Sequence, residues 1–284
     1  MALSLKEERK FEKAIVSLEK AITLKNNYAE AYFNLGNVYN LLGELEKSIN
    51  MFTRAIDIKS DYFDAYNNLG AVYNLKKDYD KAYQNIQKAI SLNPNNADAY
   101  NNLGTSALNL NKEDEAIAHY NKAISIDPKL IIAYSNLCGL FEKSNNLKDF
   151  ENILEKTKEL KLDQFGEIKF HEAQLLSRKK DFERSILLLK SIDDNEISEK
   201  TKTNKYGLLG KDFDKVQNYK EAFKCFQKTN ELVKLGVEYK QFNPTIYQEE
   251  ILELINSYSK AKKNSWMNYH QKPNFQLVFL VGFP

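Results

Sequence analysis

Asparagine recurs at a fixed, 34-residue spacing along the first half of the chain. Asn34, Asn68, Asn102 and Asn136 follow one another at this spacing, and we call these four the amide row. An asparagine side chain donates and accepts hydrogen bonds at once, so it can pair with the N–H and C=O groups of a peptide backbone. Such pairing does not depend on the side chains of the bound peptide. The row therefore indicates a polypeptide-binding surface, provided that the fold brings the four amides to one face.

Residues that carry out catalysis or bind metals do not cluster in the sequence. His119, His171 and His270 are isolated, and no HExxH, GxxxxGK[ST] or GxSxG motif is present. Cys138 and Cys225 lie far apart and form no CxxC pair, which argues against a disulfide framework or a zinc ribbon and fits a reducing compartment. We therefore expect no catalytic residue, no metal site and no complete cofactor site, and we expect that this chain is not itself an enzyme.

The composition favours helices and excludes several classes of partner. Lys and Arg number 41 against 39 Asp and Glu in 284 residues, so the net charge of +2 gives no strong field for nucleic acid or anionic lipid. Charges occur too early for a signal peptide, and no apolar run approaches the roughly 18 residues of a membrane helix. Only 5 Pro and 10 Gly interrupt the chain. We expect a cytoplasmic protein that binds neither nucleic acid nor membrane.

The same 34-residue step, which we call the repeat period, also relates apolar and small residues in successive copies. These residues are Tyr32, Tyr66, Tyr100 and Tyr134; Leu35, Leu69, Leu103 and Leu137; and Gly36, Gly70, Gly104 and Cys138. Tyrosine, leucine and a second tyrosine at i, i+3 and i+7 form the buried stripe of a helix. The small residue fits where two paired helices approach most closely. Together with Pro94 and Pro128, which close their copies, this pattern resembles the tetratricopeptide repeat.

The resemblance implies an all-α fold, a right-handed superhelix of tandem antiparallel helix pairs. Regular copies cover 29–62, 63–96 and 97–130. An incomplete copy precedes them, and divergent copies begin at 131, about 166 and about 203, with slips of one and then three residues. We expect the repeats to span 1–230, a helical extension to span 231–272, and one strand to lie within 273–284.

The same resemblance assigns the amide row a place on the fold. In tetratricopeptide arrays the first helix of each unit lines the concave surface, and its sixth position points into the groove. Neighbouring helices lie about 8–10 Å apart and an extended peptide advances about 3.3 Å per residue, so one amide per unit could bond roughly every third residue. The arrangement resembles the asparagine ladder of the O-GlcNAc transferase superhelix. The strip also includes Asn37, Asn40, Asn67, Asn74, Asn101 and His171.

Other interpretations of the strip remain open. The amides could cap neighbouring helices or face water in an asparagine-rich chain. A carboxylate clamp for chaperone C-termini, the best-known alternative use of this fold, needs basic residues beside two amides. Asn37 and Asn68 match its amides, but Phe33, Asp98 and Asn102 stand at the basic positions, which disfavours a carboxylate ligand there. We expect a peptide or protein segment as the partner, and a homo-oligomer stays open.

The repeat pattern stops after Phe226, and the end of the chain has a different character. Residues 245–263 predict one amphipathic helix. The apolar run 275–281 then leads into Gly282, Phe283 and Pro284, as a buried parallel strand leads into a phosphate-binding turn. This ending and residues 215–223 resemble bacterial proteins that join a tetratricopeptide array to a sulfotransferase domain.

The resemblance implies that a loop beyond Pro284 would bind the cofactor 3′-phosphoadenylyl sulfate at a helix N-terminus. The strand within 273–284 would then be the first strand of a sulfotransferase domain that is cut off at Pro284. Alternatively, the apolar run is a frayed tail, and the scaffold is a stand-alone adaptor for complex assembly. The sequence therefore predicts a non-catalytic peptide-binding scaffold, with the sulfotransferase link as its extension.

Overall fold

The structure, a computed structural model, describes residues 5–235. Contacts divide the chain into two units, Met1–Leu232 and Val233–Pro284. The helix expected over 245–263 and the strand expected within 273–284 lie outside the described residues. Between residues 5 and 235 the chain forms thirteen helices and no strand, which agrees with the all-α prediction.

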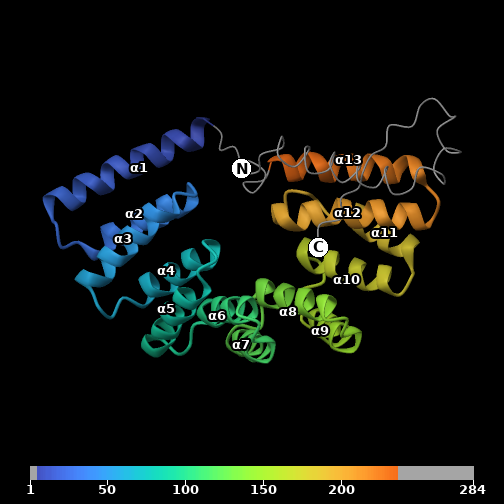
Figure 1. The fold of residues 1–284 in the computed structure, drawn as a ribbon, viewed down its shortest axis with the longest axis horizontal. Helices are drawn as coiled ribbons and strands as arrows, with labels where there is room; N and C mark the ends of the chain where they lie inside the picture. The colour runs from blue at the N-terminus through green and yellow to red at the C-terminus, as the bar shows by residue number, and fades with distance from the viewer. Residues whose placement is uncertain (1–4, 236–284) are drawn as a thin grey trace, which may run out of the picture. The chain divides into compact units, whose positions relative to one another are not determined.

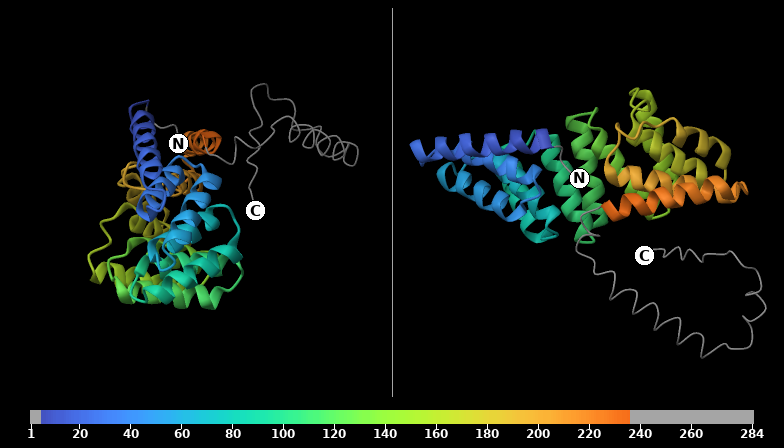
Figure 2. Two further views of the ribbon diagram at one scale, coloured as in Figure 1. Left: turned by 90° about the vertical axis from the view of Figure 1, so that its left-hand side faces the viewer. Right: turned by 90° about the horizontal axis from the view of Figure 1, so that it is seen from above.

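The helices α2 to α13 form six consecutive pairs, and α1 precedes them. Their bounds are α1 (Leu5–Leu24), α2 (Ala29–Leu41), α3 (Leu45–Ile58), α4 (Phe63–Leu75), α5 (Tyr79–Leu92), α6 (Ala97–Asn109), α7 (Glu113–Ile126), α8 (Ile131–Lys143), α9 (Leu147–Glu159), α10 (Gly166–Arg178), α11 (Phe182–Lys190), α12 (Glu199–Lys215) and α13 (Tyr219–Leu235). Figure 1 shows the pairs following one another in chain order, and Figure 2 shows the helices of a pair side by side.

The first helix of each regular unit begins where the repeat predicts. Helices α2, α4, α6 and α8 start at Ala29, Phe63, Ala97 and Ile131, and α10 starts at Gly166. The exception is α12, which begins at Glu199 and therefore a turn before the expected start near residue 203. Ser198 explains the extra turn, because its Oγ accepts a hydrogen bond from the Thr201 backbone N–H at 3.2 Å and caps the helix.

The turn between the two helices of a unit recurs with the same period. Its position also shows the added residues, one and then three, that the sequence predicts before the sixth and seventh units. It contains a residue with φ between 56° and 75° at Gly43, Lys77, Asn111, Asn145, Lys180 and Gln217. The interval equals the repeat period as far as Asn145, then exceeds it by one residue, and finally exceeds it by three. The added residues lie in the connections 160–165 and 191–198. Lys205, a buried residue, fixes the second connection by donating from Nζ to the Ile192 carbonyl and to Asp194 Oδ1, each at 2.7 Å.

Small residues allow the paired helices to approach closely. A Cβ atom at Gly104 would lie 2.7 Å from Tyr120 Cε1, and one at Gly70 would lie 2.4 Å from Ile86 Cγ1 and 3.1 Å from the Ala82 carbonyl oxygen. Tyr120 is fully buried, so it has little room to move away. The cores of these two units therefore depend on the glycine that the repeat places on the first helix.

Candidate functional site

Hydrogen bonds between consecutive units hold most of the amide row. Asn68 Nδ2 donates to Asn37 Oδ1 at 2.8 Å, Asn102 Nδ2 donates to Asn67 Oδ1 at 3.1 Å, and Asn136 Nδ2 donates to Asn101 Oδ1 at 2.9 Å. Each bond joins the first helix of one unit to the first helix of the unit before it. The three donors are half-buried, so the first helices α2, α4, α6 and α8 share a face along which these amides are aligned.

The bonding register differs at the first of these bonds for a local reason. The acceptors Asn67 and Asn101 occupy the fifth position of their units, where the preceding unit has Phe33. The Phe33 ring packs against the rings of Phe52 and Tyr62 and offers no acceptor. Asn68 therefore bonds to a residue one turn further along α2.

Asn34, the first member of the amide row, is exposed. Among the described residues only α1 precedes α2, and it supplies no equivalent of the Asn67 or Asn101 acceptor. Asn34 thus shares the position of the row without its anchoring bond. Its rotamers are therefore less restricted than those of the anchored amides.

The row continues into the sixth unit through a histidine. His171 Nε2 lies 2.8 Å from Ser135 Oγ, and His171 Nδ1 lies 2.7 Å from Gln174 Oε1. Because the amide oxygen can only accept, Nδ1 carries the proton and Nε2 accepts from the serine hydroxyl. Burial lowers the pKa of His171 to about 4, so the ring is neutral at physiological pH. Ser135 stands one repeat period after Asn101 and takes its place as the partner in the preceding unit.

A second set of polar side chains lies further along the first helices, toward their C-terminal ends. Asn74 Nδ2 donates to the Asn102 carbonyl at 3.2 Å, and Asn74 Oδ1 accepts from Ser106 Oγ at 2.9 Å. Asn40 stands one repeat period before Asn74, but its Oδ1 is buried with no hydrogen-bond partner in the described part of the chain. The reason is that Val72, which has no hydroxyl, stands one repeat period before Ser106.

The structure separates the predicted strip into residues that face solvent and residues that position them. The amide row, Asn37, Asn40 and Asn74 retain solvent exposure. Asn67, Asn101 and His171 are buried, with exposed fractions of 8%, 6% and 6%. This burial does not fit direct contact with a ligand. The three residues instead orient the neighbouring unit. Sequence reasoning missed Ser106, Ser135 and Gln174, although the repeat period, counted from Asn101, could have identified Ser135.

The anchored amides keep hydrogen-bonding capacity for a ligand. Each side-chain amide has two N–H donors and an oxygen with two lone pairs. The bond to the preceding unit uses one N–H of Asn68 and of Asn136 and leaves the second N–H and the oxygen. Because that bond also fixes the rotamer, the remaining groups are held in place before a ligand binds.

The described residues offer no evident centre for catalysis. Nowhere between residues 5 and 235 do three His, Cys, Asp or Glu side chains gather as metal ligands. Cys138 and Cys225 are buried, and burial raises the pKa of both thiols, which keeps them protonated and weakly reactive. None of the helices in the described part is both long and apolar enough to span a membrane.

The fold and this face define a class, the helical-repeat proteins, in which stacked helix pairs bury one continuous core. Family models described as tetratricopeptide repeats match residues 61–129, and residues 4–43 and 36–76. Residues 4–129 therefore carry tetratricopeptide repeats. No curated protein matches the chain.

Solved structures with the same architecture cover between 54% and 64% of the chain. A structure of the MamA protein is 28% identical, with a TM-score of 0.50, over 56% of this chain and 89% of that one. MamA from Desulfovibrio magneticus RS-1 is 23% identical, with a TM-score of 0.50, over 54% and 87%. PilF from Pseudomonas aeruginosa is 19% identical, with a TM-score of 0.55, over 64% and 83%. The likeness to the last two concerns the fold alone.

Proposed function

We propose that this tetratricopeptide scaffold binds an extended peptide segment, and that the amide row contacts the backbone of that segment. The supporting observation is the set of bonds that anchor Asn68, Asn102 and Asn136 to the preceding unit at intervals of one unit. Neighbouring helices lie about 8–10 Å apart, so successive amides meet roughly every third residue of a strand that advances about 3.3 Å per residue. Binding of this kind tolerates many peptide sequences.

The competing interpretation is that the amides only join the units. Asn102→Ala distinguishes the two, with Asn121→Ala, an exposed change on the second helix α7, as the control. The probes are two unrelated peptides of about twelve residues, the length that four units span, selected by phage display on the wild-type protein. We expect Asn102→Ala to weaken the binding of both peptides by about 0.5–1.5 kcal/mol, the net value of one hydrogen bond. Asn121→Ala should leave both affinities unchanged.

Backbone-methylated peptides complete this test. Replacing a contacted backbone N–H by N–CH₃ removes the donor that an asparagine oxygen accepts, and leaves the side chains of the peptide unchanged. We expect the methylated peptide to bind less tightly to the wild-type protein and to lose less on Asn102→Ala. Isothermal titration calorimetry gives the affinities, and urea unfolding reports stability. A loss of stability with unchanged affinity would show that the row is architectural.

We further propose that the scaffold presents acceptor peptides to a sulfotransferase domain of the same protein. Support comes from the resemblance of residues 215–223 and of the apolar run ending in Gly282, Phe283 and Pro284 to sulfotransferase fusion proteins. The alternative is a stand-alone adaptor that binds partners without any enzyme. Sequencing the reading frame past Pro284 tests this: an Arg-Ser-Gly-Thr-Thr run or a near variant supports the enzyme, and a stop codon supports the adaptor.

A further inference from the structure

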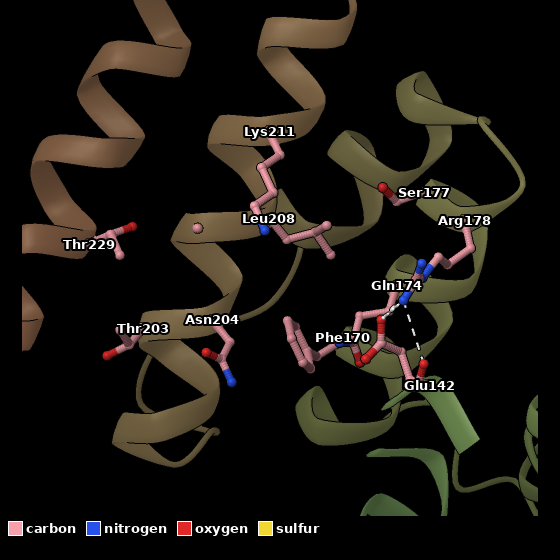
Figure 3. Close-up of a pocket in the computed structure, with 11 residues that line it drawn as sticks. Glu142, Phe170, Gln174, Ser177, Arg178, Thr203, Asn204, Leu208, Lys211 and Thr229 are labelled. Carbon is pink, nitrogen blue, oxygen red and sulfur yellow. Dashed lines mark hydrogen bonds and ion pairs between the residues drawn. The ribbon is translucent and has the colours of Figure 1, made fainter. Parts of the chain in front are cut away.

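A recess of about 580 Å³ opens beside the last member of the hydrogen-bonded row. Figure 3 shows Gln174, Arg178 and Glu142 on one side and Asn204, Leu208 and Lys211 on the other, with the Phe170 ring between them. The two sides belong mainly to α10 and α12. Gln174 belongs to both features, because its Oε1 bonds to His171 while its side chain lines the recess. A peptide that follows the row therefore reaches this recess at its end.

Gly207 lies in the wall of the recess, in the middle of α12. A glycine inside a helix costs about 1 kcal/mol relative to alanine. A Cβ atom at Gly207 would meet no other atom within 4 Å, so close packing of helices does not explain the glycine. The fifth position, which Gly207 occupies, holds a polar residue in three earlier units (Asn67, Asn101 and Ser135) and phenylalanine in two others (Phe33 and Phe170). The missing side chain leaves room for a ligand group in place of an anchoring side chain.

The charges around the recess include one cation that forms no ion pair. Arg178 is neutralised by Glu142, with Nη2 to Oε1 at 2.7 Å and Nε to Oε1 at 3.1 Å. Lys211 on the opposite side is exposed and forms no ion pair with the described residues. Gln174 keeps both N–H donors of its side chain, because the bond to His171 uses only the oxygen. The recess thus combines an available ammonium group with amide donors, which together suit a carboxylate.

We propose that the recess between α10 and α12 binds the carboxylate side chain of an Asp or Glu residue in the peptide that the amide row holds. Lys211 is its charge partner, Gln174 donates a hydrogen bond, and Gly207 leaves the space that the side chain fills. This inference rests on the proposed peptide-binding function and adds sequence preference to it. The amide row binds any backbone, and the recess selects peptides with an acidic residue in one register.

The test uses two synthetic peptide sets, each about twelve residues long, the length that four units span. The peptides consist of Ala, Ser and Thr with acetylated and amidated ends. One set carries a single Glu at each position in turn, and the other carries Gln at the same positions. Affinities are measured by fluorescence polarisation. We expect Glu to bind more tightly than Gln by about two- to fivefold in one register only, the effect of a partly exposed ion pair. Salt should reduce the preference.

Two variants and a control assign the preference to the recess. Lys211→Met should abolish the preference for Glu, whereas Lys220→Met, which removes the same charge from an exposed position on α13, should retain it. Gly207→Leu should also abolish the preference by filling the recess, and its fold should persist because leucine favours a helix and the site is open.

The outcomes separate this inference from the proposed function. If the Gln peptides bind and Asn102→Ala weakens them, but Glu gives no preference in any register, the inference is wrong and the proposed function stands. If Lys220→Met removes the preference as fully as Lys211→Met does, the preference is a general charge effect and the inference is also wrong. If no peptide of either set binds, the proposed function fails and the inference fails with it.

Discussion

At the scale of single residues, the stability of the protein depends on whether each buried amide has a hydrogen-bond partner. The Asn74 oxygen accepts from the Ser106 hydroxyl, whereas the buried oxygen of Asn40 has no hydrogen-bond partner among the described residues. A buried polar group without a hydrogen bond costs more free energy than a formed bond contributes. The same asparagine oxygen is therefore hydrogen-bonded in one unit, at Asn74, and not hydrogen-bonded one repeat period earlier, at Asn40.

Ser106→Ala should reproduce the unsatisfied state at Asn74. The change removes the donor to Asn74 Oδ1 and leaves the amide otherwise in place, so we expect the free energy of unfolding to fall by about 1–3 kcal/mol. Urea denaturation followed by circular dichroism measures the change. Ser125→Ala is the matched control, because Ser125 is exposed and bonds only to its own helix, and it should alter stability by less than about 0.5 kcal/mol. Equal effects for the two variants would contradict this account.

The same contact can be built where it is missing. Val72→Thr keeps the side-chain shape and places a hydroxyl one repeat period before that of Ser106, which donates to Asn74 Oδ1. In a double-mutant cycle with Asn40→Ala, the threonine should be more favourable by about 0.5–1.5 kcal/mol when Asn40 is present. A coupling energy near zero would show that the hydroxyl does not reach the amide.

At the scale of helices, the pairing distance is set by the small residue that faces the partner helix. Gly104 brings α6 against Tyr120 of α7, whereas Gly139 on α8 faces open space. Both glycines lie inside helices, so both carry the same low helix propensity. Because their surroundings differ, substitution by alanine should change the stability of the protein in opposite directions at the two positions.

Gly104→Ala should destabilise the protein and Gly139→Ala should stabilise it. The new Cβ at Gly104 would lie 2.7 Å from the buried Tyr120 ring, and overpacking of this kind costs about 1–3 kcal/mol. At Gly139 the new methyl group meets nothing, and the gain in helix propensity is about 0.5–1 kcal/mol. Thermal unfolding of both variants checks the signs. A destabilised Gly139→Ala protein would refute the explanation from helix contact.

At the scale of the whole repeat array, stability arises from bonds between neighbouring units. The row of amide bonds extends through Ser135 to His171, which is the one titratable member of that row. The folded array keeps His171 neutral, because burial lowers its pKa to about 4 from the ordinary value of 6.5. The stability of the array should therefore depend on pH through this residue.

The direction in which stability changes with pH follows from proton binding. Between pH 6.5 and about 4 the unfolded chain binds a proton at His171 that the folded chain does not bind, so acidification favours unfolding. The contribution is fully present above pH 6.5 and declines as the pH falls toward 4, with a slope of at most about 1.4 kcal/mol per pH unit. Urea unfolding at several pH values measures it.

His171→Asn, which restores the residue type of the amide row, should lose this slope. The difference between the wild-type and variant curves isolates His171, because burial raises the pKa of Asp212 in both proteins and that effect, of opposite sign, cancels. Parallel curves for the two proteins would show that His171 does not titrate in this range. The repeat array would then owe its acid sensitivity to other groups.

The sequence by itself determined the fold class and the positions of the units. The repeat period in tyrosine, leucine and glycine fixes which helix faces are buried, because each copy must bury the same stripe against its neighbours. The starts of α2, α4, α6, α8 and α10 agree with that period, as do the slips of one and three residues. The start of α12 differed, because the cap at Ser198 is a local feature that the period does not contain.

Only the tertiary structure decided which amides stay exposed to solvent and which are buried between the units. The sequence placed Asn67 and Asn68 on one strip, yet their partners, Asn102 and Asn37, lie on neighbouring first helices in opposite directions along the chain. The choice between them depends on rotamers and on the ring of Phe33, which blocks one acceptor position. The recess beside Gly207 likewise arises from the spacing of α10 and α12. A repeat period specifies where a helix face lies, but the side-chain contacts across it form only when the units stack.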